Sequence, residues 1–322
     1  MRSLVGRWLS MTSLLALTAI GGVGCADDTS DDDDAARSNI TSVDHSSVKR
    51  QSIGNCWIYA TASWAEALHR AATNADVDVS ESYLTYWHWF DHITSGNASD
   101  HVATGGAYVM AADIISRYGL MKEGDFIADE AGAEMSTRQK LALDAIDASL
   151  KTGVLRDREL RKDRELVRRE LDRAWRLEPS VVARMDAVFG ASVERTLDSS
   201  FDAFAASAEN RIIHAMDFDT RLKDPRTGQF VVKPLAEALG MGMGGSPLAW
   251  QVVEYPRETG ERRAFWKRVQ RALHDQMPVI TSWMIDFNAL RRDSVVSMSE
   301  LTARGPGAQG GHMTVMHDYQ AE

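Results

Sequence analysis

The stretch that decides the fold of this chain is Gln51-Ser52-Ile53-Gly54-Asn55-Cys56-Trp57-Ile58-Tyr59-Ala60. Gly54-Asn55 is a turn and cap signal that stands directly before an apolar run. Apolar residues then recur at three- and four-residue spacing, at Trp57, Ala60, Trp64 and Leu68. This spacing predicts a helix from Cys56 to about Ala72, with the cysteine in its first turn.

The position of Cys56 at the start of a helix has a chemical consequence. Backbone N–H groups and the positive end of the helix dipole point at its sulfur. These partial charges favour the thiolate and lower the thiol pKa from about 8.5, which suits a nucleophile. The alternative interpretation is a buried, small apolar side chain with no reactivity.

A second stretch near the end of the sequence carries a histidine, Gly310-Gly311-His312-Met313-Thr314-Val315-Met316-His317-Asp318-Tyr319. The residues after His312 are typical of a buried strand. An imidazole there can hold the proton of Cys56 and then give it to a leaving amine. The alternative is that His312 is a polar residue at the start of a strand, with no chemical role.

The two stretches, in this order, resemble the nucleophile and histidine motifs of papain-like cysteine peptidases. The resemblance covers about 40–130 and 250–319. It implies hydrolysis of a peptide or protein substrate through a thioester on Cys56, with no cofactor. It also implies His312 as the proton-transfer partner and an oxyanion hole made by Gln51 and the Cys56 N–H.

Further pattern leans toward the bleomycin hydrolase and aminopeptidase branch of that family. Tyr83-Leu84 and Tyr86-Trp87 follow the nucleophile helix, and Pro278-Val279 leads to Trp283 and Asp286.

The sequence departs from the family pattern in two places. Gln51 precedes Cys56 by five positions, where the family usually has six. No Asn follows His312, although the family uses one to orient the imidazole, and Asp318 is a weak substitute. Three interpretations follow: a fragment that stops before the Asn, a Cys–His dyad, or an inactive peptide-binding relative on the same fold.

Helical patterns come first and strand patterns last, which predicts an α+β fold. The resemblance implies a papain-like domain over 39–322 with two lobes, a helical N-terminal lobe and a C-terminal antiparallel sheet lobe. Within it, 134–240 is predicted to be a helical insertion, in which alternating charges indicate solvated faces. A basic substrate-binding surface is the alternative there.

Outside the part of the N-terminal region that the resemblance covers, the sequence predicts further helices and strands. The predicted helices are 135–152, 156–178, 181–189 and 263–274. The predicted strands are 250–253, 278–283 and 312–316.

The first residues have the features of a targeting signal. Residues 1–25 combine early arginines, a short apolar run and small residues before Cys25, as in a bacterial lipoprotein signal. Residues 26–38 read as an acidic, disordered tether. We therefore expect an exported protein, lipid-anchored at Cys25 on the cell envelope or secreted, which contacts a membrane only through that anchor. Cys56 is then the single cysteine of the mature chain.

Composition bounds the other function classes. The net charge of -10 argues against nucleic acid as a partner. His88 and His92 are four residues apart, the spacing of two ligands to one metal ion, and His101 is nearby. We nevertheless expect a helix that is packed by its aromatic residues and carries two histidines that bind no metal. No phosphate-binding loop is predicted at 240–245, and we expect no metal and no cofactor.

Overall fold

The computed structural model describes residues 41–198, 210–240, 246–292 and 295–319. The predictions for 1–25 and 26–38, including Cys25, lie outside these residues. Within the described ranges, no helix has the length and apolar character needed to cross a membrane.

The structure contains the following α-helices: α2 (Cys56–Thr73), α3 (Glu81–Thr94), α4 (Tyr108–Tyr118), α5 (Glu123–Phe126), α6 (Arg138–Lys151), α7 (Arg164–Trp175), α8 (Pro179–Phe189), α10 (Leu235–Leu239), α11 (Thr259–His274) and α12 (Met298–Arg304). The strands are β1 (Thr41–Ser42), β2 (Leu120–Met121), β3 (Ile212–Ile213), β4 (Asp219–Lys223), β5 (Phe230–Pro234), β6 (Val279–Asp286), β7 (Gln309–Met316) and β8 (Asp318–Tyr319). Among the described residues they form antiparallel pairs, β1 with β8, β2 with β3, β4 with β5 and β6 with β7. The predicted α+β class is confirmed.

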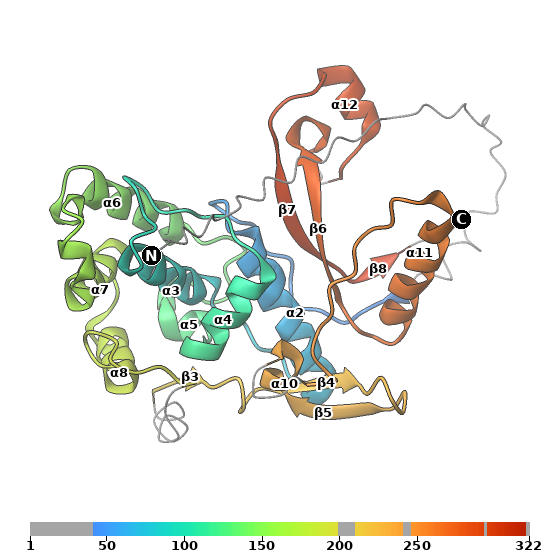
Figure 1. Ribbon diagram of the computed structural model, residues 1–322, viewed down its shortest axis with the longest axis horizontal. Coiled ribbons are helices and arrows are strands. Elements are labelled where there is room, and N and C mark those ends of the chain that lie inside the picture. Colours follow the sequence, from blue (N-terminus) through green and yellow to red (C-terminus); the bar gives the residue numbers. More distant parts are fainter. Residues whose placement is uncertain (1–40, 199–209, 241–245, 293–294, 320–322) are drawn as a thin grey trace, which may run out of the picture.

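Helix α2 is the element around which the others are arranged (Figure 1). It starts at Cys56 as predicted and ends where Asn74 adopts a left-handed conformation and donates its N–H to Arg70. Most of its first three turns are buried, because α3 and α4 cover one side and strands β4 and β7 pack on the other. In Figure 1, helices α3 to α8 lie to one side of α2, and the β6–β7 hairpin with α11 lies to the opposite side.

Helix α3 contributes an aromatic core. The Ser80 hydroxyl caps it by accepting the N–H of Tyr83 at 3.0 Å. Trp87 stacks on Tyr118 of α4, with 4.1 Å between ring centroids, and packs edge-on against Phe189 of α8. These rings join the helices that follow α2 into one core with α2 itself.

The predicted helix 156–178 is wrong in its first part. Residues 154–156 and 160–162 are short 3-10 turns, and α7 starts only after Asp163, whose carboxylate accepts the N–H of Leu166 at 2.9 Å. The guanidinium of Arg161 is bonded to the carbonyl oxygens of Leu155 and Ala98, which pins this segment in a non-helical path. Tertiary contacts therefore override the helical pattern there.

Two strand predictions also need correction. The hairpin of β4 and β5 lies inside the block 134–240, whose charged, polar sequence we interpreted as helical. Conversely, 250–253 forms no strand. Instead the Trp250 N–H donates to Ala238 at 2.9 Å and its ring contacts Tyr108, so tertiary packing fixes an irregular segment.

The predicted strands at 278–283 and 312–316 are confirmed as the long hairpin of β6 and β7. Because side chains alternate between the faces of a hairpin, Ile280, Met313 and Val315 share one face, and this face packs on the core. Trp283 and His312 are paired on the opposite face. The hairpin register therefore decides where the predicted catalytic histidine points.

Candidate active site

Cys56 is the first residue of α2, and its thiol is free and partly exposed. The chain reaches it through a tight turn in which the Asn55 N–H donates to Ile53 at 3.0 Å. At Gly54, a Cβ would lie 2.9 Å from the Thr104 hydroxyl, so this approach favours glycine. The turn signal in the sequence thus places the sulfur at the helix end.

The N-terminal N–H groups of α2 are open. The Asn55 carbonyl oxygen accepts the N–H of Ile58 at 3.0 Å, but the Asn55 side chain makes no capping bond. Within the described ranges, the N–H groups of Cys56 and Trp57 have no acceptor. Two donors and the positive end of an 18-residue helix therefore face the surroundings of the thiol.

Gln51 lies in the loop before α2 and its side chain is exposed. Its side chain has no hydrogen-bond partner among the described residues. The neighbouring Arg50 N–H donates to the Glu134 carbonyl at 2.7 Å, which anchors this loop to the segment before α6. The assignment of Gln51 to an oxyanion hole stays a prediction.

His312 lies on β7, and its ring is partly buried between Trp283 and Phe287, with centroid distances of 6.0 and 6.5 Å. Burial lowers the pKa of His312 below its ordinary value, so the neutral ring is favoured near pH 7. Strand β7 packs against α2, the helix that carries Cys56. Within the described residues, however, Cys56 and His312 share no hydrogen bond.

Asp318, the weak substitute for the orienting Asn, is placed on β8, where it pairs with Ser42 of β1. In the part of the chain that the structure describes, it forms no hydrogen bond to His312. Its electrostatic effect is on His317, whose pKa it raises against the larger lowering by burial. A role for Asp318 in orienting His312 has no support in these contacts.

The histidines on α3 are held by packing. His88 is buried, its Nε2 lies 3.0 Å from the Ala103 carbonyl and its ring packs edge-on against Trp57. Burial lowers the pKa of His88 to about 4. Across the described ranges, no three His, Cys, Asp or Glu side chains are grouped to hold a metal ion.

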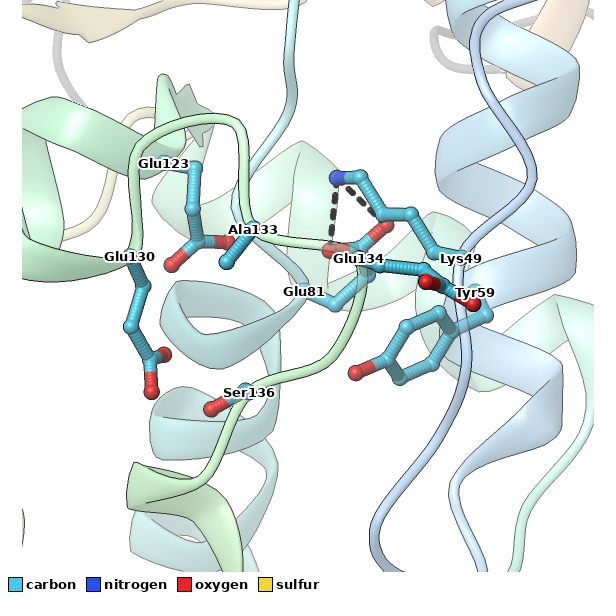
Figure 2. Close-up of a pocket in the computed structure, with 8 residues that line it drawn as sticks. All are labelled: Lys49, Tyr59, Glu81, Glu123, Glu130, Ala133, Glu134 and Ser136. Carbon is cyan, nitrogen blue, oxygen red and sulfur yellow. Dashed lines mark hydrogen bonds and ion pairs between the residues drawn. The ribbon is translucent and has the colours of Figure 1, made fainter.

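A buried charge cluster lies beside the segment that leads to Cys56 and was missed by the sequence reasoning. Lys49 donates to both carboxylate oxygens of Glu81 at 3.0 Å. Glu123 and Glu130 border the same small cavity, as Figure 2 shows. The two oxygens Glu123 Oε1 and Glu130 Oε2 are buried without a partner among the described residues. No spacing in the sequence marks these residues, because they come from separate elements.

A polar groove between α3 and α4 was also missed. It is lined by His88, Asp91, His92, Thr94, Ser95, Asn97, Val109, Met110, Asp113, Ile114, Arg117 and Arg164. Arg117 forms ion pairs with both Asp91 and Asp113 there and offsets part of their negative charge. Residues of α4 form part of the lining of this groove.

Neither the family models nor the curated proteins contain one that is similar to this chain.

Proposed function

We propose that this protein is a cysteine peptidase that hydrolyses peptide bonds through a thioester on Cys56. The observation that carries the proposal is the placement of that thiol. Cys56 is partly exposed as the first residue of a long helix, and among the described residues the N–H groups of Cys56 and Trp57 have no acceptor. A cysteine that only fills space needs none of these features.

The reaction follows from the residues. The Cys56 thiolate attacks a peptide carbonyl carbon, and negative charge develops on the carbonyl oxygen. The Cys56 N–H and the Gln51 side chain donate hydrogen bonds that stabilise this oxyanion. His312, protonated by the Cys56 thiol, gives its proton to the leaving amine. Water then hydrolyses the thioester and regenerates the thiol and the neutral imidazole.

Strand β7 packs on α2, but the face of β7 that packs on the core carries Met313 and Val315 and is opposite His312. The proposal requires the His312 ring to reach the sulfur from β7, although the structure holds no such hydrogen bond among its described residues. Catalytic hydrogen bonds are often long in a protein without substrate and tighten in the complex. Neutral His312, favoured by its lowered pKa, is the form that accepts a proton.

The wider setting of the site is part of the same proposal. We propose a two-lobe, papain-like domain with the insertion at 134–240, in the bleomycin hydrolase and aminopeptidase branch. The protein would be exported, either anchored through Cys25 or secreted, and would act on a peptide or protein without a cofactor.

A second candidate is a non-catalytic, surface-tethered peptide-binding protein on the same fold. The observation that favours it is the missing hydrogen bond between Cys56 and His312 in the described structure. In that case the open helix end would bind a peptide carbonyl without chemistry.

Labelling with an epoxysuccinyl inhibitor and with iodoacetamide separates the two functions. At pH 7 we expect Cys56 to react at least about tenfold faster than a free cysteine, because the helix end favours negative charge on the sulfur. His312→Ala should slow the epoxysuccinyl reaction about tenfold or more. His317→Ala is the matched control, since His317 is also partly buried and has a lowered pKa but packs against the His45 ring, with 3.8 Å between centroids.

Peptide mapping of the labelled protein identifies the modified residue, and Cys56→Ser gives the background. A reactivity equal to that of a free thiol would establish the binding protein instead. Equal labelling of His312→Ala and wild type would remove His312 from the mechanism.

A further inference from the structure

The residue directly before the proposed nucleophile is held by a buried hydrogen-bond network. Asn55 is fully buried, and its Nδ2 donates to Thr85 Oγ1 at 2.9 Å and to Gln139 Oε1 at 3.1 Å. Thr85 belongs to α3 and Gln139 to α6, and both are fully buried. Side chains 30 and 84 positions away in sequence therefore meet at the residue that precedes Cys56.

The directions of these bonds fix which end of the Asn55 amide faces the network. The Thr85 hydroxyl donates its proton to the Glu81 carbonyl at 2.7 Å, so toward Asn55 it can only accept. The Gln139 Nε2 donates to Ser82 at 3.2 Å, which leaves its Oε1 as the acceptor. Both partners therefore demand a donor, and the NH₂ of Asn55 supplies it.

In this arrangement the Asn55 side chain does not cap helix α2. An Asn at a helix N-cap normally turns its oxygen back to accept the N–H of the second or third helical residue. Here the side chain of Asn55 makes no such bond, and its Oδ1 is buried without a partner among the described residues. Leaving a buried acceptor unpaired destabilises the fold, so packing alone does not explain this conformation.

The consequence appears at the end of α2. If the Asn55 oxygen capped the helix, it would occupy the Trp57 N–H and set a partial negative charge close to the sulfur. Since the network holds it away, the N–H groups of Cys56 and Trp57 stay available to a thiolate or an oxyanion.

We propose that Thr85 and Gln139 are positioning residues, which hold Asn55 away from the first turn of α2 and so keep the helix end open for the Cys56 thiolate and the oxyanion. This inference rests on the proposed peptidase function. Helix α6 is the first helix of the predicted insertion, and through Gln139 it would help to position the active site.

The test measures the thiol pKa of Cys56 in the full chain from the pH dependence of iodoacetamide alkylation. Thr85→Val and Gln139→Leu nearly conserve side-chain volume, and each removes one of the two acceptors for Asn55. We expect the Asn55 oxygen to cap α2 in both, which raises the pKa and lowers the alkylation rate at pH 6 about two- to fivefold. Asn55→Asp adds a negative charge and should lower it about tenfold or more.

Two control variants separate this effect from simple loss of packing. Thr85→Ser keeps the acceptor and should behave as the wild type. Thr61→Val removes another buried hydroxyl of α2, which donates to the Trp57 carbonyl at 2.7 Å and lies outside the network. It should leave the pKa unchanged, and thermal melting followed by circular dichroism confirms that each variant is folded.

The outcomes distinguish the two proposals. A lowered wild-type pKa that Thr85→Val and Gln139→Leu leave unchanged overturns the positioning role and leaves the peptidase proposal standing. An ordinary wild-type thiol pKa overturns both. A rise in the two variants, with Thr85→Ser like wild type, supports the inference.

Discussion

At the residue scale, the buried charges next to the active-site segment explain how that segment is held. Glu66 of α2 accepts the N–H of Val79 at 2.7 Å and the hydroxyl of Ser46. Lys49 is attracted electrostatically to this carboxylate and to Glu81, and its hydrogen bonds to Glu81 join the segment before Cys56 to the start of α3. These residues order the approach to the nucleophile without touching it.

The same cluster predicts a pH dependence of stability. Burial is the largest influence on Glu81 and raises its pKa to about 8, against the opposing effect of Lys49. The carboxyl ionises near its ordinary pKa, about 4.3, in the unfolded chain and only near 8 in the folded one. The stabilisation from this group is therefore complete below about pH 4 and is lost as pH rises through 8.

Glu81→Gln, which mimics the protonated acid, should remove this loss. From pH 5 to 8 the unfolding free energy of the variant should gain on that of the wild type, by at most about 1.4 kcal/mol per pH unit. Urea unfolding at several pH values measures the difference. Glu165→Gln, whose exposed carboxylate pairs with Arg169, should give a flat difference, and a flat difference for Glu81→Gln would contradict the prediction.

At the scale of elements, the loop before α4 is fitted against the first turn of α2. The Trp57 Nε1–H donates to the Thr104 carbonyl at 2.8 Å. The indole ring fills the space next to Gly106, where an added Cβ would lie 2.4 Å from a ring carbon. Gly105 has no atom within 4 Å of such a Cβ.

Gly106→Ala should therefore displace the Trp57 ring and destabilise the fold, while Gly105→Ala should not. We expect a loss of about 1–3 kcal/mol in the free energy of unfolding for Gly106→Ala and less than about 0.5 kcal/mol for Gly105→Ala. Urea denaturation monitored by tryptophan fluorescence measures both. Equal stabilities for the two variants would contradict this fit.

At the scale of the whole molecule, the β6–β7 hairpin and the helical side meet across α2 (Figure 1). The contact depends on one face of β7, because Met313 and Val315 pack on the core. Met316 lies on the opposite face and is outside that cluster. Every second side chain of β7, on the face opposite His312, therefore holds this strand against the core.

Met313→Ala should weaken this attachment more than Met316→Ala. We expect Met313→Ala to lower the free energy of unfolding by roughly 1–2 kcal/mol, as for a partly buried side chain, and Met316→Ala by less than about 0.5 kcal/mol. Chemical denaturation measures both values. A larger loss for Met316→Ala would show that the other face of the hairpin is the packed one.

Local signals were sufficient for the elements that bracket the site. The helix that begins at Cys56 and the strand after Gly311 were both predicted, since apolar periodicity and cap residues act within a few positions. The hairpin of β4 and β5 was missed, because its charged and polar residues were interpreted as part of a helical block. No local pattern distinguished Asn55 as a network residue from Asn55 as a helix cap.

The sequence by itself determined that a lone thiol in the described chain starts a buried helix and that a histidine lies on a late strand, because both features depend on neighbours along the chain. Only the tertiary structure decided that Thr85 and Gln139 turn Asn55 away from the helix end, and that the face of β7 opposite His312 packs on the core. These outcomes depend on strand register and on hydrogen bonds between residues far apart in sequence, which no spacing records.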